Sequence, residues 1–294
     1  MDEHIIEALG KTKITINDGK VTKIEEPQIE YCPLFHKHRG IEKLNGETIK
    51  ENIEFRIKDF GMCTPERKLY LDDFLSFGIS EIISTLIEEK IIDTSIIVCE
   101  GAGTVIIKDP RMVQGIGGRI SAFIKTSPIK KIIKEIGEDN ILNPETAEIN
   151  QIEGLKKAIN QGYKKIAVTV ALSSDVEEIR KIEKEHNDVE IYIFVVHTSK
   201  ASMEDARIFF KYADFITACA SKNVRLIGEK ESKLTAGQSV PIYAASENGK
   251  YFLQKRIDKI GGLKDKPNAK IPNPLIWLYI YNIIFFALIF GFSW

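Results

Sequence analysis

Apolar residues recur along this chain with two periods, and each period predicts a kind of element. Between residues 13 and 24 they alternate with polar residues on both sides of Asn17-Asp18-Gly19, a turn sequence that predicts a β-hairpin. In residues 47–60 and 71–90 they recur every three or four positions, which predicts two helices with a buried stripe. The chain therefore begins with a hairpin and a helical lead.

From residue 95 onward, short apolar runs alternate with helical patterns. Strands are predicted at 95–98, 165–171, 189–196, 214–218 and 239–244, and helices at 128–136, 151–161, 174–182, 202–212 and 249–260. Strands separated by helices of this length are typical of right-handed crossovers, which bury a parallel sheet between helices. The sequence predicts an α/β fold whose mostly parallel sheet carries helices on both faces.

Composition shifts divide the chain into four segments. We expect a lead over residues 1–62, an α/β ligand-binding domain over 63–263, a linker over 264–274 with three prolines and three lysines, and an uncharged apolar segment over 275–294. About twenty helical residues match the thickness of a bilayer core. The apolar segment is therefore a candidate transmembrane or docking helix, with a buried helix, an oligomer contact or a shifted reading frame as alternatives.

Charge and cysteine use restrict the class of protein. The 41 basic residues balance 42 acidic ones, so no charge excess favours nucleic acid, and we expect no nucleic-acid partner. The N-terminus shows no apolar signal sequence, and the four cysteines are spread along the chain. These features predict a cytoplasmic protein, with a possible membrane contact through residues 275–294, whose thiols are free or metal-bound.

Reactive residue types follow the predicted strands. In an open parallel sheet, ligands bind outside the carboxyl ends of the strands. The strands are followed by Cys99-Glu100-Gly101, Leu172-Ser173-Ser174-Asp175, His197-Thr198-Ser199 and Cys219-Ala220-Ser221-Lys222. We interpret Cys99, His197 and Cys219 as candidate catalytic residues, with Cys99 as nucleophile and His197 as its base. The alternatives are inert buried thiols and a structural histidine.

Two glycine clusters suggest an anion site. Glycines just past a strand let backbone N–H groups converge on a phosphate or carboxylate. The candidate binding residues are Gly101, Gly103, Thr104, Gly115, Gly117, Gly118, Arg119 and Lys222. Ile106 stands where a dinucleotide fingerprint would have its third glycine, which disfavours that cofactor. The glycines could instead only form tight turns.

A metal site is a second hypothesis. Cys32, Cys63 and Cys99 offer three thiolates for zinc or an iron-sulfur cluster, and His36 and His38 lie close to Cys32 in sequence. The chain contains no Cys-x2-Cys pair, which weakens the zinc interpretation. The cofactor thus stays open between a phosphate-containing ligand and a metal centre.

Several segments, among them CEGAGTVI, VQGIGGR, TACASKNVR and AGQSVPIYAAS, resemble the methanogenesis marker protein 8 family of methanogenic archaea. The likeness covers about residues 31–262, and the apolar segment 275–294 departs from it. The resemblance implies a role in methane formation, in maturing methyl-coenzyme M reductase or handling one of its cofactors, with the maturation proteins of that enzyme as partners. It assigns no catalytic residue.

Three functional hypotheses follow. The first is an enzyme or accessory factor that binds an anionic small molecule at the glycine-rich loop. The second is a metal or iron-sulfur protein that uses Cys32, Cys63 and Cys99. The third is a non-catalytic assembly factor.

Overall fold

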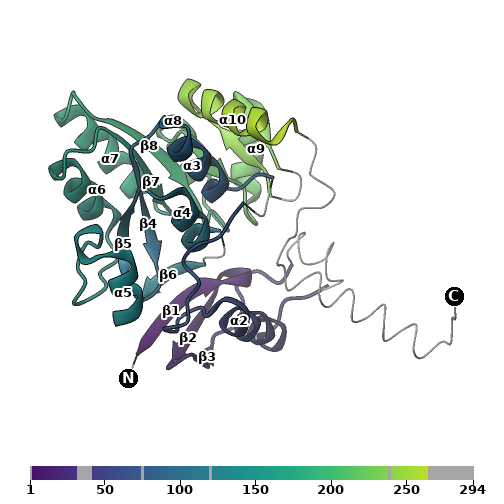
Figure 1. The fold of residues 1–294 in the computed structure, drawn as a ribbon. Helices are drawn as coiled ribbons and strands as arrows, with labels where there is room; N and C mark the ends of the chain where they lie inside the picture. The colour runs from purple at the N-terminus through teal and green to yellow at the C-terminus, as the bar shows by residue number, and fades with distance from the viewer. Residues whose placement is uncertain (1, 32–41, 74–75, 119–120, 238–239, 264–294) are drawn as a thin grey trace, which may run out of the picture.

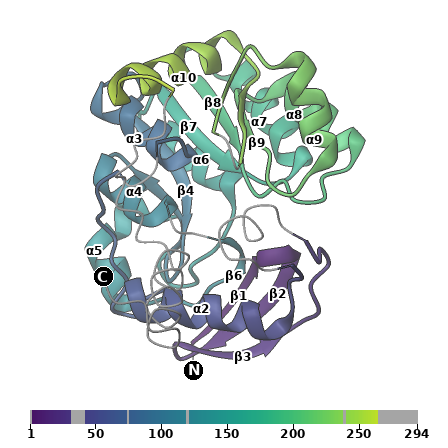
Figure 2. The same ribbon diagram turned by 90° about the vertical axis from the view of Figure 1, so that its right-hand side faces the viewer.

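The computed structural model describes residues 2–31, 42–73, 76–118, 121–237 and 240–263. These residues form a small four-stranded sheet and a larger seven-stranded sheet, which lie one below the other in Figures 1 and 2. The chain builds most of the small sheet first, crosses to the large sheet, and returns once to add a strand to the small one.

The small sheet has the strand order β3-β2-β1-β6 and is antiparallel throughout. Its strands are β1 (Glu3–Ala8), β2 (Thr12–Asn17), β3 (Lys20–Ile24) and β6 (Ala122–Lys125). The β2-β3 pair confirms the predicted hairpin. Helix α2 (Gly46–Phe60) confirms the first predicted helix and buries Ile49 and Ile53 in the core of this sheet. Strands β1 and β6 were not predicted.

The large sheet has the strand order β10-β11-β9-β8-β7-β4-β5. Its strands are β4 (Thr94–Cys99), β5 (Gly103–Ile107), β7 (Lys165–Val170), β8 (Glu190–Val195), β9 (Phe215–Thr217), β10 (Leu234–Ala236) and β11 (Ile242–Ala244). The central strands β4, β7, β8 and β9 are parallel, whereas β5, β11 and β10 join by antiparallel pairing. The prediction of a mostly parallel sheet is corrected to a mixed sheet. A three-residue connection from β4 to β5 is too short for a parallel crossover.

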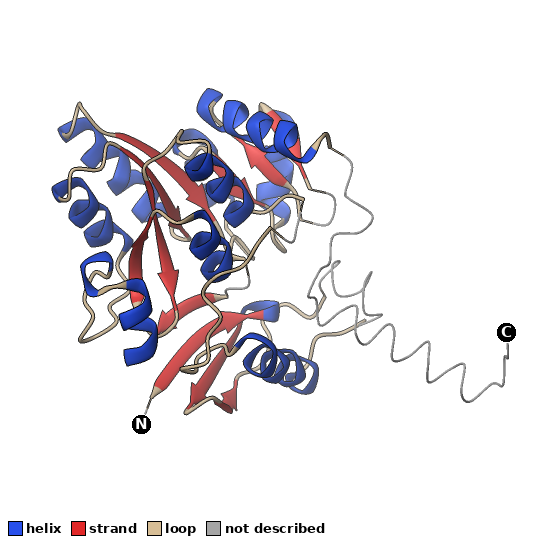
Figure 3. Ribbon diagram, viewed as in Figure 1, coloured by secondary structure: helices blue, strands red, loops and turns tan. Residues whose placement is uncertain are grey.

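Helices cover both faces of the large sheet, as predicted (Figure 3). One face carries α3 (Ile79–Glu88), α4 (Pro110–Gly117), α5 (Lys130–Ile136) and α10 (Glu247–Ile260); the other carries α6 (Gln151–Asn160), α7 (Ser173–Glu185), α8 (Met203–Tyr212) and α9 (Lys222–Glu231). Successive residues of a strand point to opposite faces, so Ile96 packs in one core and Ile97 in the other.

One helix prediction needs correction, and one helix was not predicted. The helix expected over residues 71–90 is shorter, because α3 begins only after Gly78, and the Leu71 N–H donates to the carbonyl of Arg111 instead. The second glycine cluster was predicted to help bind an anion, with tight turns as the alternative, and Gly115 and Gly117 in fact belong to the unpredicted helix α4. Asp109 caps this helix, and Pro110 occupies its first turn, a position that suits proline.

The predicted linker 264–274 and apolar helix 275–294 lie outside the described residues. Among the helices that the structure describes, none combines the length and apolar character needed to cross a membrane.

Candidate functional site

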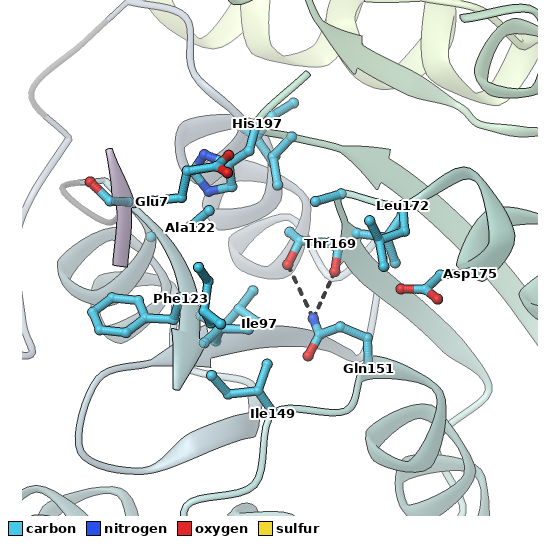
Figure 4. A pocket seen from close by; sticks show the side chains of 18 of the residues that line it. Glu7, Ile97, Ala122, Phe123, Ile149, Gln151, Thr169, Leu172, Asp175 and His197 are labelled. Carbon is cyan, nitrogen blue, oxygen red and sulfur yellow. Dashed lines mark hydrogen bonds between the residues drawn. The ribbon is translucent and has the colours of Figure 1, made fainter. Parts of the chain in front are cut away.

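A pocket of about 610 Å³ lies between the two sheets, at the carboxyl edge of the parallel strands. Its floor comes from the ends of β4, β7 and β8, and its opposite wall from β1 and β6 (Figure 4). Helices α3 and α4, together with the start of α6, complete it. The predicted edge of the large sheet therefore does form a cavity, and the small sheet closes it.

Most of the lining is apolar. The apolar side chains come from every wall: Ile79, Ile83, Ile97, Val98, Val113, Ala122, Phe123, Ile124, Ile149, Ile152, Val170, Ala171, Leu172 and Val196. The polar side chains are fewer: Glu7, Lys11, Ser80, Ser121, Asn150, Gln151, Thr169, Asp175 and His197. An apolar cavity with a few converging polar groups is typical of small-molecule sites.

Gln151 fixes one polar part of the wall. Its amide nitrogen donates to the Thr169 carbonyl at 2.7 Å (Figure 4). Its amide oxygen accepts from the Thr104 hydroxyl at 2.8 Å. These bonds connect the first residue of α6 to β7 and β5. The amide is therefore held by the protein, and it sets the shape of the pocket more than it offers free hydrogen bonds.

His197 is the first of the predicted catalytic residues to consider, and it lines the pocket. It follows β8 in the left-handed backbone region, with φ of 56°, which is strained for a non-glycine residue. Burial, and secondarily the positive charge of Arg56, lowers the pKa of His197 to about 4. The imidazole is therefore neutral at physiological pH and offers one donor and one acceptor.

Three further ionisable side chains line the pocket. Lys11 Nζ lies 3.8 Å from Glu7 Oε1, so these two charges offset one another. Asp175 stands in the first turn of α7, and burial raises its pKa. The lining thus contains one paired acid, one paired base and a carboxyl group without a cation beside it in the described part of the chain.

The glycine loop after β4 does not offer the predicted anion cradle, because its amides are already engaged. The Gly101 N–H donates to Thr126 Oγ1 at 2.8 Å, and the Thr104 N–H donates to the Glu148 carbonyl at 2.8 Å. A side chain at Gly103 would lie 2.3 Å from the carbonyl oxygens of Ala147 and Glu148. Protein atoms thus occupy the space that an anion would need, and the glycines form a tight β4-β5 turn.

The second glycine cluster is likewise a packing feature. Gly115 lies against the Leu69 carbonyl, where a Cβ would approach to 1.8 Å, and its own carbonyl accepts from Arg67 Nη2. Gly117 lines the pocket, Gly118 caps α4, and Arg119 lies outside the described residues. Of the predicted anion-binding residues in the described part of the chain, Gly117 alone lines the pocket.

The structure does not bring Cys99 and Cys219 to the pocket beside His197. Cys99 is fully buried, its thiol contacts the Glu100 carbonyl, and burial raises its pKa well above the usual value, with the Glu100 charge adding to the effect. Cys219 is half-buried, Lys222 is exposed at the start of α9, and neither lines the pocket. The expected pairing of Cys99 with His197 is corrected, because a neutral buried thiol is no nucleophile.

Cys63 and Cys99 lie in a second region between the sheets, which we call the closed interface and define as His4, Cys63, Arg67, Cys99, Glu100 and Thr126. Burial also raises the pKa of Cys63 well above its usual value, with the nearby Glu100 and Cys99 among the further causes. Arg67 Nε donates to Glu100 Oε1 at 2.5 Å, and both side chains are almost fully buried.

The predicted metal set is incomplete in this region. Cys32, with His36 and His38, lies outside the described residues. Among the residues that the structure describes, no group of three or more His, Cys, Asp or Glu side chains is arranged to hold a metal ion. A zinc or iron-sulfur centre therefore stays a prediction that depends on Cys32.

Several pocket residues were not among the sequence predictions. Glu7 and Phe123 come from strands of the small sheet, Lys11 from the turn between β1 and β2, and Ser80 and Gln151 from helices α3 and α6. The rule that ligands bind at the carboxyl ends of strands does point to Asp175, which follows β7. The same rule contains no information about the strands that cover this edge.

Comparison with known proteins supports a shared family. Residues 4–258 match the family DUF2099, described as an uncharacterized protein conserved in archaea. An uncharacterized protein of the methanogen Methanocaldococcus jannaschii is 44% identical over 285 residues, which cover 94% of this chain and 100% of the relative. The match spans both sheets and every wall of the pocket.

Proposed function

The chain belongs to the archaeal family DUF2099, and we propose that it binds a small organic molecule in the pocket between its two sheets. The observation that supports this proposal is the cavity of about 610 Å³ at the carboxyl edge of β4, β7 and β8. Its volume falls in the range of small-molecule sites, about 300–1,000 Å³.

The lining indicates the general chemistry of the ligand. Aliphatic side chains cover most of the wall, and burying apolar ligand surface against them would supply most of the affinity. Neutral His197 and the carboxyl group of Asp175 would orient the ligand. If the protein also catalyses a reaction, His197 is the side chain best placed to accept a proton, since both thiols of the closed interface are buried.

The test is a retention experiment with an occluding variant. Ala171 lines the pocket and is solvent-exposed, so Ala171→Phe would obstruct the cavity without disturbing a core. Asn160→Phe, at the exposed end of α6 and away from the pocket, is the matched control. Full-length protein would be equilibrated with the small-molecule extract of a methanogen, washed and analysed by native mass spectrometry.

We expect a compound to be retained by the wild type and by Asn160→Phe, and to be lost from Ala171→Phe. Identical retention profiles for the three proteins, or no retention at all, would overturn the proposal. Circular dichroism would establish that both variants fold.

A biological role in methane formation is a further part of the proposal. It is supported by the resemblance to the methanogenesis marker protein 8 family and by the relative from a methanogen. Under this proposal, deletion of the gene in a methanogen lowers the fraction of methyl-coenzyme M reductase that carries its full cofactor and modification set, as read by mass spectrometry. An unchanged enzyme in the deletion strain would exclude this role.

A further inference from the structure

The charges around the pocket are unevenly balanced. Four ionisable side chains line it: Glu7, Lys11, Asp175 and His197. Glu7 and Lys11 form an ion pair whose side chains are 27% and 29% exposed, and His197 is held neutral by burial and by Arg56. Asp175 is left as the carboxyl group whose charge no lining residue offsets.

Helix capping does not explain Asp175. In a capping box, the side chain of the third helical residue accepts from the N–H of the residue before the helix. Asp175 holds this position in α7, yet the N-terminus of α7 has no side-chain cap. The hydrogen bond recorded for its carboxylate comes from the adjacent Ser174 hydroxyl at 3.5 Å, the limit of such an interaction.

Asp205 provides a comparison within the same fold, because it holds the same position in α8. Its carboxylate accepts from the Ser202 N–H at 3.1 Å and from the Ser202 hydroxyl at 2.6 Å, which completes a capping box. Hydrogen bonds from Ser173 and Ser202 lower the pKa of Asp205, whereas burial raises that of Asp175. The two carboxylates share a local sequence position, and only the one that lines the pocket lacks these strong partners.

We infer that the ligand carries a protonated nitrogen, such as an alkylammonium group, which pairs with Asp175 while its apolar body fills the pocket. This inference rests on the proposed function and specifies the class of ligand. An amine N–H donor to a carboxylate forms a charge-assisted hydrogen bond, stronger than a neutral one. A carboxylate that is partly removed from water also gains more from a cation than an exposed one does.

The arrangement of the pocket suits such a molecule. Figure 4 places Asp175 beside Leu172, at the opposite end of the pocket from Glu7, with Gln151 next to it and the apolar side chains of Ile97, Ile149 and Phe123 farther toward the small sheet. A molecule with its ammonium group at Asp175 would therefore lay its hydrocarbon part along these apolar side chains. An anionic group at the same end would face a like charge.

The experiment compares three probes of equal length: hexylammonium, hexan-1-ol and hexanoate. Isothermal titration of the full-length protein at neutral pH should give the order hexylammonium, hexanol, hexanoate, with the ammonium at least about tenfold tighter than the alcohol. Tenfold corresponds to about 1.4 kcal/mol, within the range of a hydrogen bond to a charged group. The preference should decline as pH is lowered through the pKa of Asp175, because the neutral carboxyl no longer attracts a cation.

Two variants assign the effect to its residue. Asp175→Asn should reduce the preference for the ammonium over the alcohol to within about twofold while leaving hexanol binding unchanged, since the apolar wall is intact. Glu177→Gln removes the same charge from an exposed position on the same helix, outside the pocket lining, and should keep the wild-type preference.

The failure of this inference differs from the failure of the proposed function. Hexanol binding as tightly as hexylammonium, or hexanoate binding tightest, would overturn the inference and leave a pocket that takes another kind of ligand. Compounds retained from the extract that all lack a basic nitrogen would also overturn it. The absence of probe binding, together with an extract profile that Ala171→Phe leaves unchanged, would reject both.

Discussion

Two regions lie between the small and the large sheet, and they use polar residues in opposite ways. In the closed interface, buried polar groups pair across the sheets: Arg67 pairs with Glu100 Oε1, and His4 Nδ1 lies 2.6 Å from the Thr126 hydroxyl. Glu100 Oε2 and His4 Nε2 are buried there without a hydrogen-bond partner among the described residues. In the pocket, aliphatic side chains surround a cavity, and within the described residues the carboxylate of Asp175 has only the 3.5 Å bond from Ser174. The region rich in thiols and charges is filled, and the apolar region is hollow.

A ligand site needs two separate properties, reactive side chains and unfilled space, and a sequence pattern reports only the first. Cysteine, glutamate and glycine after a strand indicate chemistry at a sheet edge, but such groups can equally hold two layers of a protein together. A ligand site also needs unfilled space, which depends on how distant segments pack. Residue type alone favoured Cys99 and His197 equally, whereas packing keeps only His197 at the pocket and adds Asp175.

The largest expected effect is the loss of the buried ion pair. Arg67→Met should lower the free energy of unfolding by about 3–5 kcal/mol, because it leaves the Glu100 carboxylate buried without its partner. Arg67 also donates to the carbonyls of Gly115 and Lys68, which would lose a donor. Urea unfolding followed by circular dichroism measures the change.

The matched control is an ion pair of the same type on the surface. The side chains of Arg111 and Asp72 are 64% and 86% exposed, so Arg111→Met should cost about 0–1 kcal/mol. Adding Glu100→Gln to Arg67→Met should recover part of the lost stability, since no buried charge remains unpaired. Equal costs for the two single variants would show that the interface is not shielded from water.

The second prediction tests whether the glycine loop is packed or open. Gly103→Ala should destabilise the protein by roughly 3 kcal/mol, the sum of backbone strain of about 1–3 kcal/mol and a further cost of overpacking. Its φ is 75°, and a Cβ would meet two carbonyl oxygens at 2.3 Å. Thermal or urea unfolding measures the loss.

Gly162→Ala isolates the strain from the contact. Gly162 has φ of 91° with nothing within 4 Å of a Cβ, so the same substitution there should cost only the backbone part, about 1 kcal/mol. If both variants lost equal stability, the loop after β4 would have room beside it, and the anion-cradle interpretation would regain support.

Local patterns predicted much of the large sheet. Strands β4, β7 and β8 lie within one or two residues of the apolar runs that predicted them, because buried parallel strands need continuous apolar sequence. Strand β6 could not be predicted in this way. It has only four residues, and two of them are exposed. It forms because it pairs with β1, which lies more than 100 residues earlier in the chain.

Helix α4 shows a conflict between local preference and packing. Each glycine in a helix costs about 1 kcal/mol relative to alanine, so the sequence PRMVQGIG, with two glycines, does not predict a helix. The structure keeps Gly115 there because the Leu69 carbonyl approaches too closely for any side chain. The rule that ligands bind at the carboxyl ends of parallel strands found His197 and the segment that holds Asp175. It could not find the opposite wall of the pocket, because that wall depends on the long-range pairing of β1 with β6.

The smallest expected effect on stability is that of Asp175→Asn, which should stabilise the protein, whereas Arg67→Met should destabilise it. A raised pKa in the folded state means that folding favours the neutral carboxyl. The free energy of unfolding therefore falls as pH rises above the pKa of Asp175 in the unfolded chain, and the loss is complete above its pKa in the folded protein. Asp175→Asn should therefore raise the unfolding midpoint at neutral pH by a few degrees at most, since the favourable interaction of a carboxylate with the N-terminus of α7 is lost in return.

The gain should shrink as pH falls and disappear below the pKa of an unfolded aspartate, where the wild-type side chain is neutral in both states. Differential scanning calorimetry from pH 3 to pH 8 follows this dependence, and Asp205→Asn serves as its counterpart, because loss of that capping carboxylate should lower the midpoint. A destabilised Asp175→Asn at neutral pH would show that the carboxylate supports the helix instead of the pocket. Stability gained when a polar group of the pocket is removed is the usual mark of a residue kept for binding, because its cost to the empty protein is offset only when the ligand arrives.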